Sequence, residues 1–195
     1  MRFDIDDNHL KEQLYEIEKL NLNEFRSSIS DLSKKIMVAL DEGGTLAFLG
    51  NGGSAAEANH LAAEFTGKCV LNHKPLRSIS LSSNTSSITA IANDYGNEFI
   101  FSRQVEALLN SRSILIAMST SGKSINVLKA LFVAQKLNIH TVLWTGREFR
   151  AENGKKIADE VWIAPSNSTP RVQEIHLIWG HLVAECVEKL VVDSE

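Results

Sequence analysis

Short apolar runs alternate with longer amphipathic stretches from Thr45 to the end of this 195-residue chain. The runs are largely apolar throughout, as expected of strands that are buried on both faces. Alternating strands and helices are typical of a parallel sheet covered by helices. We therefore predict an α/β fold with three layers, α/β/α, around a five-stranded parallel sheet. The expected strands are 45–49, 76–81, 113–118, 140–144 and 160–163, and the expected helices are 54–66, 86–94, 99–109, 124–137 and 169–192.

Residues 8–42 precede this alternation and show helical periodicity. Asn21 and Glu24 have the spacing of a capping box, which predicts two helices that meet near residues 21–23. We expect the region to pack on the core and on other subunits, so that residues 1–195 form one domain. The apolar residues at three- and four-residue spacing are Leu10, Leu14, Ile17, Phe25, Ile29, Leu32, Ile36 and Leu40.

The composition excludes several classes of protein. Hydrophobic residues make up 44% of the chain, too many for a disordered one, and 20 basic against 24 acidic residues give a charge of −4. Binding to nucleic acid depends on basic residues, so we expect no nucleic-acid partner. No apolar run approaches the roughly 20 residues that span a bilayer, so no membrane association is expected. The acidic N-terminus and two cysteines, Cys69 and Cys186, favour a cytoplasmic location with buried thiols.

A glycine-rich loop follows the first expected strand, with Asn51, Gly52, Gly53 and Ser54 leading into a helix. Glycines allow close approach of the backbone to a ligand, and a helix N-terminus attracts an anion. Ala55 stands where a dinucleotide-binding loop has its third glycine, and no Gly-Lys-Ser/Thr follows. The loop is therefore either an ordinary turn or a phosphate site of another kind.

A hydroxyl-rich loop follows the third expected strand and contains Ser119, Thr120, Ser121 and Ser124. Ligands of open α/β sheets bind at the carboxyl ends of the strands, and hydroxyls can donate hydrogen bonds to phosphate. A solvated serine-rich cap is the alternative. Two such loops in one sheet favour a phosphorylated small molecule as the ligand.

Titratable side chains follow the first loop and recur in the last helix. His60 and Glu64 are four residues apart and share one helix face. Gln173 and His181 differ by about 80° around their helix, so they can face one cavity, whereas His176 points elsewhere. A lone His–Glu pair is usually only helix surface, but its place beside a phosphate loop favours a site.

Three motifs carry a resemblance to a known family: residues 50–54, residues 119–122 and the run Arg171-Val172-Gln173-Glu174-Ile175-His176. Together they resemble the sugar isomerase (SIS) domain and, within it, the phosphoheptose isomerase family. The resemblance implies a flavodoxin-like sheet and a homotetramer with active sites between subunits. It also implies the aldose–ketose isomerisation of sedoheptulose 7-phosphate to D-glycero-D-manno-heptose 7-phosphate, or a close epimer, through an enediol.

The same resemblance implies roles for individual residues. Glu64 would be the carbon acid/base and His181 its acid/base partner. One zinc ion per subunit would be held by His60, Glu64, Gln173 and His181, although glutamine is an unusual zinc ligand. The substrate contacts would be Asn51, Gly52, Gly53, Ser54, Glu64, Asn93, Asp94, Ser119, Thr120, Ser121, Ser124 and Gln173.

Two departures from the family pattern and two alternative functions stand beside this interpretation. Pro170 occupies a position where some members carry an acidic residue, and residues 146–150 lack the glycines common after the fourth strand. One alternative is a non-catalytic SIS protein that binds a sugar phosphate or the replication initiator. Such proteins lack the carboxylate and the histidine that this chain keeps as Glu64 and His181. The other is an isomerase of a different sugar phosphate.

Overall fold

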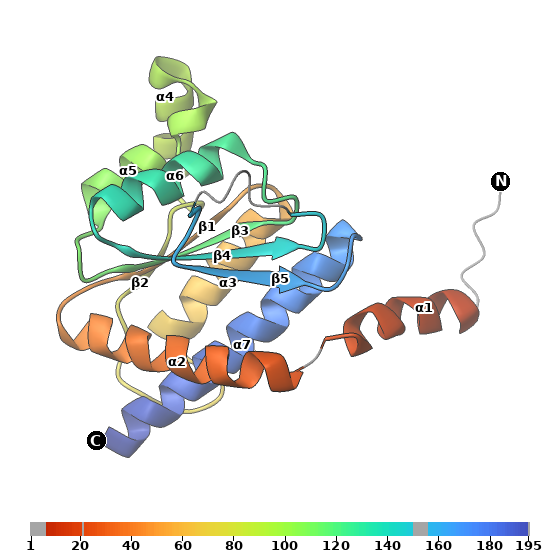
Figure 1. The fold of residues 1–195 in the computed structure, drawn as a ribbon. Helices are drawn as coiled ribbons and strands as arrows, with labels where there is room; N and C mark the ends of the chain where they lie inside the picture. Colours follow the sequence, from red (N-terminus) through yellow and green to blue (C-terminus); the bar gives the residue numbers. More distant parts are fainter. Residues whose placement is uncertain (1–6, 21, 150–155, 195) are drawn as a thin grey trace.

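The computed structural model describes residues 7–20, 22–149 and 156–194. A five-stranded parallel sheet has the strand order β2-β1-β3-β4-β5, which confirms the predicted α/β fold. Helices α4, α5 and α6 lie on one side of the sheet, and α2, α3 and α7 lie on the other (Figure 1). The elements are α1 (Asp7–Glu18), α2 (Leu22–Asp41), β1 (Leu46–Gly50), α3 (Gly53–Thr66), β2 (Ser78–Ser80), α4 (Thr85–Tyr95), η1 (Asn97–Phe99), α5 (Ser102–Leu108), β3 (Ile114–Ser119), α6 (Ile125–Lys136), β4 (His140–Gly146), β5 (Glu160–Ala164) and α7 (Thr169–Ser194).

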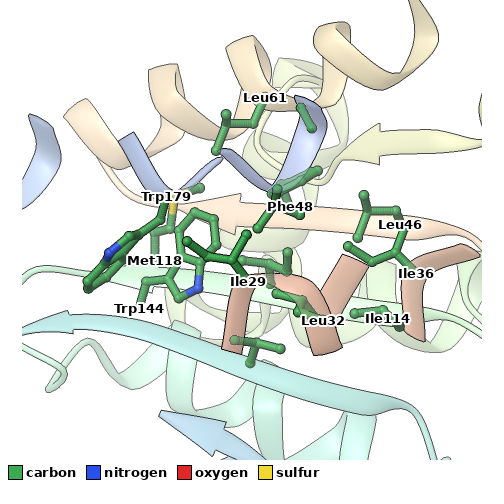
Figure 2. Close-up of a cluster of buried hydrophobic side chains, with 14 of the residues drawn as sticks. Ile29, Leu32, Ile36, Leu46, Phe48, Leu61, Ile114, Met118, Trp144 and Trp179 are labelled. Atoms are coloured by element: carbon green, nitrogen blue, oxygen red, sulfur yellow. The ribbon is translucent and has the colours of Figure 1, made fainter. Parts of the chain in front are cut away.

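The central strands are buried on both faces and feed two separate apolar clusters. In β1, Leu46 and Phe48 belong to the lower cluster, on the face of the sheet that α2, α3 and α7 cover. Ala47 and Leu49 belong to the upper cluster, on the opposite face, which α5 and α6 cover. This alternation follows from the two-residue period of a strand. The lower cluster joins the sheet to α2, α3 and α7 (Figure 2). The two layers fix where each strand ends, and so fix the loops that follow.

The stripe predicted on α2 packs against the core of the chain. Leu32 and Ile36 are fully buried, and Ile29 is nearly so, in the lower cluster between α2 and the sheet (Figure 2). The expected packing of this region on the core is therefore confirmed for these residues, and its contact with other subunits stays a prediction. Spacing alone shows that a helix has an apolar face, but it does not show what covers that face.

Helix α1 projects from the body of the molecule (Figure 1) and contacts it at α7. Its Leu14 and Tyr15 side chains are 61% and 59% exposed, and Gln13 accepts a hydrogen bond of 2.9 Å from Arg171 Nη1. The side chains of Leu10 and Glu24, and the whole of Asn21, lie outside the described residues, so the capping box is not described.

The edge strand β5 differs from the expectation of burial on both faces. Trp162 and Ala164 are buried in the lower cluster, whereas Val161 and Ile163 are 37% and 43% exposed. The strand therefore has the alternating burial typical of a sheet with one open face.

One expected helix, over residues 99–109, is shorter and is preceded by the 3₁₀ turn η1. Gly96, at φ 105°, ends α4 and introduces this turn. Asn93 and Asp94 lie in the last turn of α4, at the end of the helix expected over residues 86–94. In the described ranges, no helix is both long enough and apolar enough to cross a membrane.

Candidate active site

The glycine-rich loop leaves the start of α3 open to a ligand. Gly52 has a φ of 55°, which favours glycine, and no side chain caps the first turn of the helix. A Cβ atom on Gly53 would lie 2.1 Å from Gln173 Nε2, so the Gln173 amide rests directly on the loop. The N–H groups of Ala55 and Ala56 donate to the Gly52 carbonyl, which leaves those of Gly53 and Ser54 for an acceptor such as phosphate.

The hydroxyl-rich loop is organised by its own side chains. Ser119 Oγ donates to Ser124 Oγ at 3.2 Å, and Ser121 Oγ accepts a bond of 3.2 Å from the Lys123 backbone. Helix α6 also begins without a side-chain cap, whereas α4 is capped by Asn84. In both helices that follow the predicted phosphate loops, the N-cap residue therefore makes no side-chain capping bond.

An amide pair joins the two loops. Asn51 Nδ2 donates to Asn126 Oδ1, and Asn126 Nδ2 donates to Asn51 Oδ1, each at 2.9 Å. A cleft of about 550 Å³ lies beside this pair, and its lining includes Lys123, Ser124 and Glu98. Sequence reasoning missed Asn126. Its one signal was a polar residue between Ile125 and Val127 in the apolar start of a helix.

Helices α3 and α7 bring the predicted titratable residues together. His60 Nε2 lies 2.8 Å from His181 Nε2 and 3.4 Å from Glu64 Oε1. The two imidazole rings meet edge to face, with 5.1 Å between their centroids. The i, i+4 spacing on α3 therefore places a carboxylate and an imidazole on the face that α7 covers.

A glycine sets the distance between these two helices. A Cβ atom on Gly180 would lie 2.3 Å from Leu61 Cδ2, so α3 and α7 approach too closely there for a side chain on α7. Gly180 and Leu61 are the sequence neighbours of His181 and His60. The close approach of the helices therefore supports the short distance between the two imidazoles.

The cluster has the donor types of a zinc site. One ligand atom from each of His60, Glu64 and His181 lies within 4.8 Å of the other two. Two nitrogens bound to one tetrahedral zinc ion lie about 3.3 Å apart, since each bond is about 2.0–2.1 Å long. A small movement of the rings would thus admit an ion. The fourth predicted ligand, Gln173, has its amide against Gly53, at the first loop.

Two further groups near the cluster carry unusual electrostatics. Glu57 is 5% exposed, and in the residues that the structure describes neither of its carboxyl oxygens has a partner at hydrogen-bond geometry. Burial raises the pKa of Glu57 to about 7, against a smaller lowering by the Ser54 hydroxyl. Burial and the carboxylates of Glu64 and Glu188 raise the pKa of Cys69 to about 11, so its thiol stays protonated at neutral pH. Sequence reasoning did not single out Glu57 because it lies on an ordinary helical repeat.

Other sequence-predicted positions lie apart from the cluster. Asn93 Nδ2 donates to Asp94 Oδ1 at 2.7 Å, both residues are exposed, and Asp94 lines a cavity between α4 and α5. His176 is fully buried and stacks on Trp179, and desolvation lowers its pKa to about 3. Pro170 lies in the first turn of α7, where a missing N–H costs no hydrogen bond.

Comparison with known proteins identifies the class and then the family. The model of the SIS domain matches residues 12–146, which is more than half of the chain, so the chain belongs to the SIS domain family. It is 43% identical over 187 residues to a phosphoheptose isomerase from Helicobacter pylori (strain P12), covering 95% of this chain and 96% of that one. It is 42% identical over 171 residues to a probable phosphoheptose isomerase from Thermoplasma acidophilum, covering 88% and 92%. The chain is therefore an isomerase of the phosphoheptose isomerase family.

Solved structures agree with this placement. A phosphoheptose isomerase from Neisseria gonorrhoeae superposes with a TM-score of 0.79 at 32% identity, covering 93% of this chain and 96% of that chain. One from Francisella tularensis superposes with a TM-score of 0.85 at 27% identity, covering 94% and 96%.

Proposed function

We propose that the protein converts sedoheptulose 7-phosphate to D-glycero-D-manno-heptose 7-phosphate, or a close epimer. One observation carries the proposal. Helix α3 begins at a phosphate-type loop and, further along, carries His60 and Glu64, and His60 contacts His181 of α7. A site for an anion and a site for proton transfer therefore lie along one rigid element.

The spacing along α3 favours an extended substrate. Ser54 and Glu64 are ten residues apart, which corresponds to about 15 Å along the helix axis. Helical side chains lean toward the N-terminus, so the carboxylate comes closer to the loop than its own Cα atom does. A sugar with its phosphate at the far end of the carbon chain from the carbonyl suits such a separation.

The proposed reaction moves protons between neighbouring atoms of the open sugar. Glu64 removes the proton from C1 of the ketose, which forms the enediol, and returns it to C2. His181 moves the hydroxyl protons, taking one from O1 and giving one to O2, so that the carbonyl shifts from C2 to C1. A carboxylate can serve as the carbon base, and histidine titrates near neutral pH. The loop residues Asn51, Gly52, Gly53, Ser54, Ser119, Thr120, Ser121 and Ser124, together with Asn93, Asp94 and Gln173, would hold the substrate.

Zinc is the proposed cofactor, one ion per subunit. His60, Glu64 and His181 would hold it, with Gln173 as the fourth ligand once its amide leaves Gly53. A bound zinc ion would supply Lewis acidity at the substrate oxygens. The alternative is that the ion occupies these ligands only when substrate is absent, which leaves Glu64 and His181 free for proton transfer when the sugar binds. Replacing His60 with alanine should lower the zinc content of the purified protein well below one ion per chain. Zinc retained at full stoichiometry would contradict this ligand set.

We also propose that the protein is a homotetramer in the cytoplasm and that residues 1–195 form one SIS domain. Exposed apolar side chains on α1, on the segment after α3 and on β5 support the assembly, because such groups gather at interfaces between chains. They are Leu14, Tyr15, Val70, Leu71, Val161 and Ile163. Replacing Val161 and Ile163 with lysine should lower the mass measured by light scattering, because two charges would then lie in the contact.

The test of the proposed activity is incubation with sedoheptulose 7-phosphate, followed by NMR identification of any aldose. Formation of a heptose 7-phosphate is the expected result. Phosphate-free sedoheptulose should react far more slowly, because the loops would have no anion to hold. Faster turnover of a pentose or hexose phosphate would transfer the proposal to that substrate.

A further inference from the structure

Asn126 is the residue that ties the two loops together. Its Oδ1 accepts hydrogen bonds from Asn51 Nδ2 and from the Val127 backbone, each at 2.9 Å, and its Nδ2 donates to Asn51 Oδ1. The side chain is buried, at 5% exposure. Most of its hydrogen-bonding capacity is therefore used within the protein.

The glycine-rich loop needs such an anchor. Gly52 and Gly53 have no side chain with which to fix the loop, and no side chain caps α3. On one side, Ser82 Oγ donates to the Gly50 carbonyl at 2.9 Å and accepts from the Gly50 N–H at 3.2 Å. On the other side, Asn126 holds Asn51. The loop after the central strand is thus fastened to the segments that follow both neighbouring strands, β2 and β3.

We propose that Asn126 is a positioning residue, which acts through Asn51 to hold the glycine-rich loop in register with the hydroxyl-rich loop. With this register, the N-termini of α3 and α6 face the same phosphate-bearing substrate. The amide of Asn51, which the family resemblance assigns to the substrate, keeps only one N–H and one lone pair for other partners. The main role of the Asn51 amide is to join the two loops. This inference rests on the proposed function for the identity of the substrate.

The test compares Asn126→Ala, Asn51→Ala and the double variant. Asn126→Ala should raise the KM for sedoheptulose 7-phosphate about tenfold, equivalent to about 1.4 kcal/mol, with kcat within twofold of the wild type. The Kd for inorganic phosphate, followed by NMR titration, should rise in parallel. The double variant should bind no more weakly than Asn51→Ala alone, because Asn126 acts through Asn51.

Asn110→Ala is the matched control. Asn110 Oδ1 accepts a hydrogen bond of 2.9 Å from the Arg112 backbone N–H. This pair precedes β3 and so lies at the amino ends of the strands, away from the two loops. This variant should lose some thermal stability and keep the wild-type KM and phosphate Kd.

Three results would overturn the inference. The first is a wild-type phosphate Kd in Asn126→Ala, and the second is an additive loss of binding in the double variant. The third is a fall in kcat with unchanged KM, which indicates a smaller folded fraction only. The phosphate titration does not require turnover, so a wild-type protein inactive on sedoheptulose 7-phosphate would refute the proposed function and leave this test intact.

Discussion

At the amino ends of β4 and β5, half-buried and exposed charges are paired, whereas on α3 the buried carboxyl of Glu57 has no hydrogen-bond partner within the described part of the chain. Glu160 contacts Lys35 Nζ at 2.6 Å and His140 Nε2 at 2.9 Å, and Asp159 contacts Lys156 Nζ at 2.6 Å. For both carboxyl oxygens of Glu57, on α3, the described residues offer no hydrogen-bond partner.

The pKa values of the two regions shift in opposite directions. Burial alone would raise the pKa of Glu160, but hydrogen bonds from His140 and Lys35 outweigh it and lower the value to about 2. Burial raises the pKa of Glu57 to about 7. The paired carboxylate therefore stays ionised down to low pH, whereas the Glu57 carboxyl changes protonation near neutral pH.

The largest expected effect concerns α3, at the candidate active site. Glu64→Gln should lower kcat by about a thousandfold, because it keeps the size of the side chain and removes a general base. Its circular dichroism spectrum and its binding of sedoheptulose 7-phosphate should stay near those of the wild type. Glu106→Gln, on the exposed face of α5, is the control with unchanged kcat. Retention of most of the activity in Glu64→Gln would remove this residue from the chemistry.

A stability effect that depends on pH should follow from Glu57→Gln. The unfolded chain loses the Glu57 proton near pH 4.5 and the folded chain near pH 7, so wild-type stability falls as the pH rises between these values. The variant has no such loss. It should therefore be more stable than the wild type by about 2 kcal/mol at pH 8, and by less at pH 5, in urea unfolding. A variant less stable than the wild type at pH 8 would break the comparison, since Glu57 would then have a partner in the assembled protein.

Glu160→Gln should show the opposite dependence. The folded pKa of Glu160 lies near 2 and the unfolded value near 4.5, so its contribution is complete above pH 4.5 and is lost as the pH falls toward 2. The variant should be less stable by about 1 kcal/mol at pH 7, after allowance for solvent screening, and equal to the wild type at pH 2. Thermal unfolding at the two pH values measures this. A constant difference at both would mean that lost packing, and not charge, is responsible.

The smallest expected effect is at the hydroxyl-rich loop. Ser121→Ala removes one hydroxyl and should raise the KM for the sugar phosphate about threefold, within the range of a single hydrogen bond. The KM for phosphate-free sedoheptulose should not change. Equal effects on both sugars would assign the Ser121 hydroxyl to the loop and not to the phosphate.

The sequence predicts the sheet well because each central strand repeats one simple rule. Runs such as Ile114–Met118 are apolar throughout and end in loops of distinctive composition. The edge strand β5 is also apolar, but it is not buried on both faces, since Val161 and Ile163 are exposed. Apolar character does not reveal whether a helix covers a given face.

The site could be predicted as a set of residues, but not as a geometry. Helical spacing brings His60 and Glu64 to one face, but the contact with His181 depends on how α3 and α7 cross. Asn51 and Asn126 are 75 positions apart in the sequence, so no local pattern predicts that they pair. The surroundings of Glu57 are equally tertiary, because its pKa depends on burial by segments far away in the chain.

The contact between Gly180 and Leu61 bears on how this protein can change over evolutionary time. In a saturation survey of the chain, position 180 should tolerate substitution as poorly as the acid–base residues, although it has no side chain. A first step to alanine should force Leu61 or the helices to move, and so disturb the contact of His60 with His181, unless Leu61 has already become smaller. The order of mutations therefore matters at this helix crossing, and lineages that keep the larger residue at position 61 should keep glycine at 180.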